Sequence, residues 1–433
     1  MAKIVIIHGW SDDYKSFENL RRDVAQQIPG ADVSDISLVD YLSLNDDVLF
    51  SDIVESLDQQ WDRQGLPREP RSVDVIVHST GALVLRDWLT KKFTYDNNPI
   101  HRLLMLAPAN FGSPIAHKGR TFIGRLMKGD GFETGTHLLK GLELASSYSW
   151  KLAEKDRLRR NYYGKGRILA TTLVGNYGYT GFAAVANEDG SDGTVRLSTA
   201  NLNMAYYKVN LDDDNPRFTA RYRNDTAFGV MSGENHSTIV NGDMPYNNEQ
   251  TLQWIIEALN VTDDTYTDLK KKLRMHTNAV MRENKKGRHR KHNPYFNGYQ
   301  NTVIHVIDQD GNELTDYLLE LKVNDEDSNW FTEILQRDAI RKVHVYGDNR
   351  SYRSIYIDCT SLHKYIDKSI DNLSITITAY PKFTADDERS VGYSEIGSIK
   401  LNYKQVKKLF QENRTVLMEI VVKRDRKAVV EIY

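Results

Sequence analysis

The sequence predicts an α/β protein: a mainly parallel sheet flanked by helices, followed by a smaller all-β, sandwich-like domain. In the first 260 residues, short apolar runs typical of buried strands alternate with segments whose apolar residues recur every three or four positions, as in helices. From residue 298 onward, short strand-like runs separated by turn residues follow one another. Alternating strands and helices form βαβ units, which place functional side chains at the carboxyl ends of parallel strands.

Length and composition narrow the class of protein. The chain has 433 residues, 40% of them hydrophobic and 27% charged, and a net charge of −2. A chain of this length is expected to form two domains, and its charge gives no indication of a nucleic-acid partner. The single cysteine, Cys359, excludes an internal disulfide and lies in a strand-like run, so we expect it to be buried and inert.

The chain shows no secretory signal and no apolar run approaching the ~18 residues of a membrane span. We therefore expect a cytoplasmic protein, with export by a route that needs no N-terminal signal as the alternative.

The elements of the first domain follow from these periodicities. Apolar runs predict strands, apolar residues that recur every three or four positions predict amphipathic helices, and Gly65 with Pro67 ends the second helix. The expected strands are 3–7, 33–39, 73–77, 101–106, 167–174 and 218–222, and the expected helices are 14–28, 46–64, 81–89 and 252–259.

Three further segments complete the predicted organisation. Residues 115–165 carry apolar clusters among charges and predict a helical insertion, either a packing excursion or a lid over the site. Residues 261–297 are rich in Lys and Arg and are expected to form a solvated linker, or else a segment attracted to an anionic membrane or partner. Residues 298–433 form the β domain, with hairpins expected at 303–323, 342–357 and 416–433; the acidic run 325–327 is interpreted as a solvated turn rather than a calcium site. The catalytic domain is thus expected to span 1–260.

The stretch from 73 to 89 has the pattern of a strand, a sharp turn with a serine at its tip, and a helix. The turn is His78-Ser79-Thr80-Gly81. Small residues are needed there because the backbones of the strand and the helix approach closely, and Gly81 meets that need on the helix side. Val77 stands where a glycine is expected, which leaves the geometry of the turn open.

A serine hydroxyl is a weak nucleophile that needs an adjacent base, and the base needs a carboxylate to fix its tautomer. The acidic motif containing Asp192 follows the predicted strand 167–174, with Glu188 and Asp189 as alternatives. His236 is the one histidine between Asp192 and residue 260. Histidines and carboxylates show no metal-ligand spacing, so no metal is expected.

Five motifs in this order resemble the lipase-like branch of the α/β-hydrolase superfamily, which contains class 2 bacterial lipases and lecithin-cholesterol acyltransferase-type enzymes. They are His8-Gly9, His78-Ser79-Thr80-Gly81, Phe111-Gly112-Ser113-Pro114, Ser191-Asp192-Gly193-Thr194-Val195 and Asn235-His236-Ser237. The resemblance covers residues 1–260 and implies an α/β-hydrolase fold. It also implies Ser79 as nucleophile, Asp192 as acid and His236 as base, with an oxyanion hole formed by the backbone N–H groups of Trp10 and Thr80. It implies no cofactor.

This resemblance predicts a serine hydrolase that cleaves carboxylic esters through an acyl-enzyme. The apolar insertion favours a lipid or acyl-chain ester, and the candidate substrates are a phospholipid, a neutral lipid and a small ester. The alternatives are an acyltransferase with the same triad, a membrane-attacking lipase effector, and an inactive hydrolase scaffold that serves as a binding protein. The expected partners are the ester substrate and a peripheral membrane or protein contact through the basic linker or the β domain.

Overall fold

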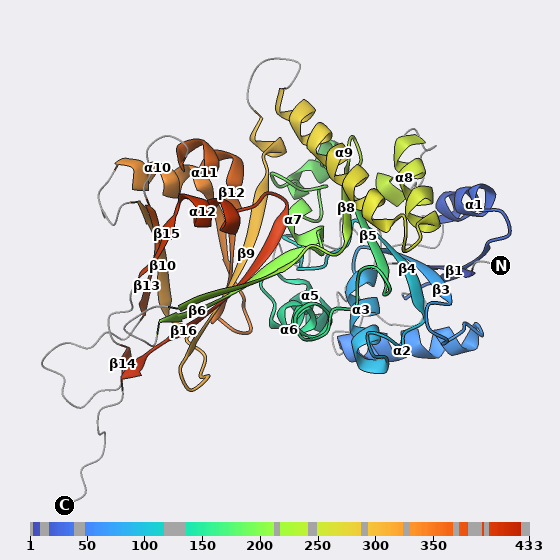
Figure 1. Cartoon of the computed structure of the whole chain (residues 1–433), viewed down its shortest axis with the longest axis horizontal. Coiled ribbons are helices and arrows are strands. Elements are labelled where there is room, and N and C mark those ends of the chain that lie inside the picture. Colours follow the sequence, from blue (N-terminus) through green and yellow to red (C-terminus); the bar gives the residue numbers. More distant parts are fainter. Residues whose placement is uncertain are drawn as a thin grey trace, which may run out of the picture. The chain divides into compact units, whose positions relative to one another are not determined.

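Figure 1 shows the chain as a computed structural model. It forms two compact units: a first unit of Met1–Asn203 and Arg223–Phe296, and a second unit of Met204–Tyr222 and Asn297–Tyr433. The residues that the structure describes are 3–8, 17–38, 48–116, 136–211, 217–240, 249–286, 293–323, 330–366, 372–379, 392–393 and 398–425.

The first unit is built on a six-stranded sheet with the order β2-β1-β3-β4-β5-β8, in which every neighbouring pair is parallel. The central strand β3 is buried along its whole length, as expected for a parallel sheet covered on both faces. The strands are β1 (Lys3–Ile7), β2 (Asp32–Ile36), β3 (Val73–His78), β4 (Ile100–Leu106), β5 (Leu169–Gly175) and β8 (Ala227–Met231).

Helices cover both faces of this sheet (Figure 1). On one face lie α1 (Glu18–Gln27), α8 (Glu249–Asn260) and α9 (Tyr266–Lys286); on the other lie α2 (Phe50–Arg63) and α3 (Gly81–Lys92). The layer of α2 and α3 is held by apolar packing, with the rings of Trp61 and Trp88 4.8 Å apart. This arrangement confirms the predicted α/β architecture.

The described part of the predicted insertion packs on this second helix layer. It comprises α5 (Thr136–Leu142), α6 (Ser147–Ala153) and the π-helix η2 (Glu154–Arg159). The ring of Tyr148 stacks on Phe50, and its hydroxyl donates a 2.9 Å hydrogen bond to Asp87 of α3. Residues 117–135, the rest of the predicted lid, lie outside the described residues.

The second unit contains a six-stranded mixed sheet, β11-β12-β9-β16-β6-β7, and a three-stranded antiparallel sheet, β10-β13-β15, whose apolar side chains share one core. Short helices accompany these sheets, a feature that the all-β prediction did not include. The elements are β6 (Met204–Leu211), β7 (Arg217–Arg223), β9 (Tyr299–Asp308), β10 (Tyr317–Val323), α10 (Trp330–Ala339), β11 (Ile340–Val345), β12 (Tyr352–Asp358), α11 (Cys359–Ile366), β13 (Asn372–Ala379), β14 (Gly392–Tyr393), β15 (Ser398–Asn402), α12 (Tyr403–Leu409), β16 (Arg414–Val422) and β17 (Arg424–Asp425).

Several details differ from the expectations. The predicted hairpin of 303–323 is wrong, because β10 pairs with β13 rather than with β9. β16 lies between β9 and β6, parallel to both, and so does not begin a terminal hairpin. The antiparallel pair of β11 and β12 is confirmed. The acidic run 325–327 and residues 426–433 lie outside the described residues.

The structure also divides the chain at other positions than the predicted boundaries. β6 and β7 belong to the sheet of the second unit, whereas residues 204–222 were expected in the first domain. Most of the expected linker is the helix α9. Cys359 is fully buried, as predicted. Within the described residues, no helix combines the length and the apolar character needed to cross a bilayer.

Candidate active site

Ser79 lies at the turn between β3 and α3 with a backbone φ of 53°. A non-glycine residue in this left-handed region is strained and persists only where its surroundings hold it. Two backbone hydrogen bonds do so: the N–H of Ser79 donates to the carbonyl of Leu106 (3.2 Å), and its own carbonyl accepts from the N–H of Ala109 (3.2 Å). The sharp turn projects the side chain of Ser79 at the carboxyl edge of the sheet.

The residues around the serine explain why the chain can turn there. A Cβ atom at Gly81 would lie 3.2 Å from the carbonyl oxygen of Ile7 and 3.3 Å from that of His8, so the start of α3 needs a small residue. Val77 is fully buried inside β3, in register with Ile7 and Met105. The turn therefore forms with valine at the position where a glycine was expected.

The structure brings the three residues predicted from the motifs together. Nε2 of His236 lies 3.1 Å from Oγ of Ser79, and Nδ1 of His236 lies 3.0 Å from Oδ2 of Asp192. Because the carboxylate only accepts, Nδ1 carries the proton and donates it to Asp192. Nε2 is then an acceptor, so the hydroxyl of Ser79 donates to it. This tautomer is the one that can take a proton from the serine.

Asp192 is fully buried, and its carboxylate is satisfied on both oxygens. Oδ1 accepts from the backbone N–H groups of Thr194 (2.9 Å) and Val195 (2.7 Å), which leaves Oδ2 for His236. Of the alternative acids, Glu188 forms a buried ion pair with Arg196 at 2.6 Å. The structure thus brings Asp192, rather than Glu188, to the histidine.

The loop that carries His236 follows β8 and is fixed at several points. The N–H of His236 donates to the carbonyl of Asp192 (3.0 Å). Glu234 accepts from the hydroxyls of Thr238 (2.5 Å) and Thr251 (3.1 Å). A Cβ atom at Gly175, the last residue of β5, would lie 2.1 Å from the carbonyl oxygen of Glu234, so this position requires glycine. The strand 218–222, which was expected to precede this loop, is β7 of the second unit.

The structure describes one of the two predicted oxyanion-hole residues. Thr80 directly follows Ser79 and occupies the N-cap position of α3, where the helix dipole favours negative charge. Trp10 and Gly9 lie outside the described residues. The Phe111–Pro114 motif contacts the loop that carries Asp192, since the hydroxyl of Ser113 donates to the carbonyl of Thr194 (2.6 Å). No group of side chains suited to hold a metal ion occurs in the described ranges of the chain.

The sequence motifs did not indicate a buried network of polar side chains that begins at Arg86. Arg86 of α3 forms a two-point ion pair with Asp156 of η2, at 2.8 and 3.1 Å, with both side chains almost fully buried. Arg86 also donates to the carbonyl of Asn110 (2.9 Å), and the amide of Asn110 donates to the carbonyl of Ala200 (2.8 Å). Burial disfavours the charge on Arg86, but Asp156 more than offsets this, so the pKa of Arg86 is raised. The only signal in the sequence was the charged pair Arg86-Asp87 within the largely apolar run from 82 to 89.

No protein-family model matches the sequence, and no curated protein matches it either. The structure is similar to that of phospholipase PlaB from Legionella pneumophila, with a TM-score of 0.84 and 25% sequence identity over 98% of this chain and 94% of that chain. PlaB in complex with thio-NAD matches with the same values. The lipase BlEst2 of Bacillus licheniformis matches at a TM-score of 0.39 and 16% identity, over 59% of this chain and 91% of that chain. The first unit has an α/β-hydrolase fold.

Proposed function

We propose that this chain is a serine hydrolase that cleaves carboxylic esters of phospholipids. The observation that carries the proposal is the hydrogen-bonded series of Ser79, His236 and Asp192 at the carboxyl edge of the sheet, with the serine on a strained turn. Support for the substrate class comes from the similarity to a phospholipase, which extends over almost the whole length of both chains.

The geometry supports a two-step reaction. Oγ of Ser79 attacks the ester carbonyl and passes its proton to Nε2 of His236, while Asp192 stabilises the imidazolium. The N–H of Thr80 donates to the developing oxyanion, a contribution typically worth ~3 kcal/mol per donor. His236 then protonates the leaving alcohol, and an acyl-Ser79 ester remains. Water, deprotonated by His236, attacks this ester, releases the fatty acid and regenerates the serine.

Two finer assignments stay predictions of the sequence: membership in the class 2 lipase branch, and water rather than an alcohol as acyl acceptor. An acyltransferase would use the same three side chains. Supplying an alcohol with the substrate separates the two, because a hydrolase releases free fatty acid while an acyltransferase forms a new ester.

The test is covalent labelling with a fluorophosphonate probe, together with fatty-acid release from phospholipid vesicles. The wild type is expected to label and to release fatty acid, whereas Ser79→Ala should lose labelling and lower kcat by roughly 10⁶-fold. Ser51→Ala, an exposed serine on α2, is the matched control and should behave as the wild type. Labelling that survives in Ser79→Ala would refute the assignment of the nucleophile, and a folded wild type that neither labels nor hydrolyses would refute the function.

A further inference from the structure

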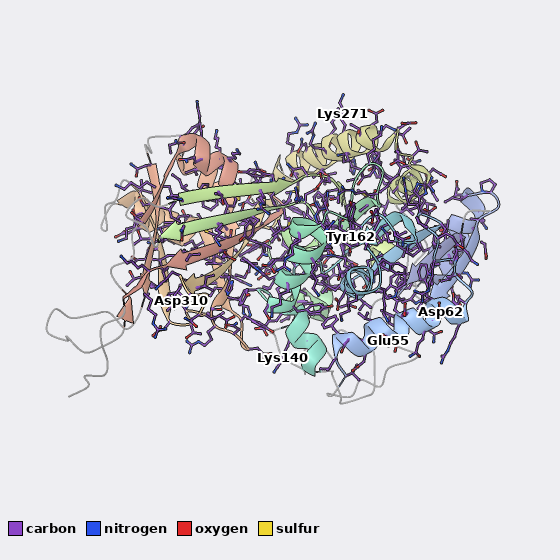
Figure 2. All side chains as sticks on the ribbon, turned by 60° about the horizontal axis from the view of Figure 1, so that its bottom comes forward. Glu55, Asp62, Lys140, Tyr162, Lys271 and Asp310 are labelled. Atoms are coloured by element: carbon purple, nitrogen blue, oxygen red, sulfur yellow. The ribbon has the colours of Figure 1, made fainter. Side chains whose placement is uncertain are left out.

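The helix α9 has one buried and one exposed face. Its buried side chains pack on the sheet of the first unit, next to β5 and β8. They are Tyr266, Leu269, Leu273, Thr277, Val280 and Met281. Its opposite face is exposed to solvent, and Figure 2 shows Lys271 on this outer side.

The direction of α9 relative to the sheet follows from its contacts. Near its start, the hydroxyl of Tyr266 donates to the carbonyl of Ala170, early in β5. Further along, Thr277 accepts from the N–H of Val230, late in β8. Val280 and Met281, near the end of the described side chains, share an apolar cluster with Val174 and Val230. The helix therefore runs parallel to the strands, and its C-terminal part lies at the edge that carries Ser79, Asp192 and His236.

The exposed face carries a row of cations. The basic stripe, as we define it, consists of Lys271, Arg274, Met275, Asn278 and Arg282, all exposed and spaced at i, i+3, i+4, i+7 and i+11, which places them on one side of the helix. None of the three cations forms an ion pair with another residue in the described ranges, whereas the neighbouring Lys272 is paired with Glu257. Met275, with 60% of its surface exposed, lies among them.

We propose that the basic stripe docks the first unit on an anionic phospholipid bilayer; this rests on the proposed function. Three unpaired cations on one helical face complement the negative surface of such a bilayer. An exposed methionine among them supplies an apolar contact to the boundary of the acyl chains. Because the helix ends at the catalytic edge of the sheet, docking there brings the triad towards the surface that holds its substrate.

The test is co-sedimentation with vesicles of pure phosphatidylcholine and of phosphatidylcholine with 30 mol% phosphatidylglycerol, carried out in the Ser79→Ala background so that the vesicles stay intact. The stripe variant combines Lys271→Gln, Arg274→Gln and Arg282→Gln. The control combines Lys404→Gln, Lys407→Gln and Lys408→Gln, three exposed residues of α12. Both variants change the net charge equally, so any difference between them reports on the location of the charge.

Each Lys or Arg near an anionic surface strengthens binding by about fivefold, so the stripe variant should bind phosphatidylglycerol vesicles roughly 100-fold more weakly than its parent. The control should bind as the parent does. Binding by the parent should also fall in ~0.5 M NaCl, because salt screens the attraction. Equal losses in both variants, or no loss in the stripe variant, would overturn the proposal.

A separate assay tests the proposed catalytic activity. With Ser79 present, the stripe variant should hydrolyse a soluble short-chain nitrophenyl ester at the wild-type rate but release fatty acid from anionic vesicles more slowly. If the wild type hydrolyses neither substrate while vesicle binding still depends on the stripe, the proposed function fails and the docking surface stands.

Discussion

Nε2 of His78 lies 3.0 Å from the backbone carbonyl oxygen of His236. Because a carbonyl only accepts, Nε2 of His78 carries the proton and donates it. The two rings are 4.7 Å apart, and the ring of Phe17 meets His78 edge-on at 5.6 Å. His78 directly precedes Ser79, so one short turn carries Ser79, the proposed nucleophile, and also contacts the backbone of His236, the proposed base. We infer that His78 is a positioning residue.

Replacing His78 with phenylalanine keeps a ring in this place but removes the donor to His236. We expect His78→Phe to lower kcat about tenfold with little change in KM, because an unpaired buried carbonyl costs ~1–3 kcal/mol and the base loop relaxes to avoid that cost. Steady-state kinetics on a soluble ester measures this. A kcat within twofold of the wild type, in a variant of unchanged Tm, would show that the hydrogen bond does not position the base.

Replacing Asp192 with asparagine tests the acid. The remaining Oδ1 can still accept from the N–H groups of Thr194 and Val195, so the loop should keep its shape. The new amide N–H group would face Nδ1 of His236 and favour the tautomer with the proton on Nε2, which cannot accept the proton of Ser79. We expect Asp192→Asn to lower kcat by about 10⁴-fold with a near-native Tm.

The alternative acid gives the contrasting variant. Glu188→Gln removes the carboxylate that lies 2.6 Å from the buried Arg196, so it should lower the free energy of unfolding by ~3 kcal/mol while the folded fraction keeps most of its kcat. Active-site titration with the fluorophosphonate probe gives the folded fraction. The reverse outcome, with Asp192→Asn active and Glu188→Gln inactive, would move the role of the acid to Glu188.

Much of the first unit was predictable because its elements are long and strongly periodic. β3 is buried throughout and four of its six residues are Val or Ile, and α2 has one apolar stripe, so the hydrophobic pattern alone located both elements. The order of the motifs also selected Ser79, Asp192 and His236, and the structure places these three side chains within hydrogen-bonding distance of one another. They come together because the carboxyl ends of parallel strands meet at one edge of the sheet. The positive φ of Ser79 agrees with the prediction of a sharp turn.

The predictions that were wrong concern segments that pair with residues far away in the sequence. β6 joins the sheet of the second unit and pairs with β16, which lies more than 200 positions later in the chain. No local feature of the β6 sequence distinguishes it from a strand of the first unit. The charged composition of α9 suggested a linker because its apolar side chains occupy only one narrow face. The contact of His78 with His236 likewise joins residues 158 positions apart and leaves no local pattern.

The buried pair of Arg86 and Asp156 makes a prediction about stability. Asp156→Asn leaves the charge of Arg86 buried without a counter-ion, so we expect a loss of ~3–5 kcal/mol in the free energy of unfolding, measured by urea denaturation. Asp62→Asn is the control: Asp62 pairs with Arg68 on the outside of α2 (Figure 2), and its loss should cost less than ~1 kcal/mol. Equal effects would mean that the buried pair does not stabilise the fold.

His101 of β4 predicts a dependence of stability on pH. Burial, reinforced by Arg102 and Arg71, lowers the pKa of His101 to about 4, against 6.5 as its ordinary value. Between pH 6.5 and 4, His101 is protonated in the unfolded chain but not in the folded chain. The contribution of His101 to the free energy of unfolding is therefore complete above pH 6.5 and is lost as the pH falls towards 4. After allowance for partial exposure, this amounts to about 1–2 kcal/mol. His101→Gln should remove this pH dependence, so the free energy of unfolding of the variant relative to the wild type should rise by about 1–2 kcal/mol when the pH is lowered from 7.5 to 4.5.

Tyr295, in the 3₁₀ turn η5 (Pro294–Phe296), is linked twice to the loop that carries the acid. Its hydroxyl donates to the carbonyl of Ser191 (2.7 Å), and its own carbonyl accepts from the N–H of Gly190 (2.9 Å). Burial raises the pKa of Tyr295, so the phenol stays protonated as a donor at neutral pH. The neighbouring Phe296 ring lies 5.4 Å from that of Tyr177, whose N–H donates to the carbonyl of Glu234 in the base loop. The turn thus contacts the acid loop directly and the base loop through one residue.

Tyr295→Phe removes only the hydroxyl and so tests whether this contact aligns Asp192 with His236. We expect a fall of about three- to tenfold in kcat and in the rate of fluorophosphonate labelling, with KM unchanged, because the labelling rate depends on the reactivity of Ser79 in the folded protein. Tyr162→Phe is the matched control, since it deletes a hydroxyl that donates to the carbonyl of Phe93 at the C-terminal end of α3, the end opposite Ser79. Both variants should lower Tm by similar small amounts. If both label at the wild-type rate, the hydroxyl of Tyr295 stabilises the loop without tuning the reactivity of the serine.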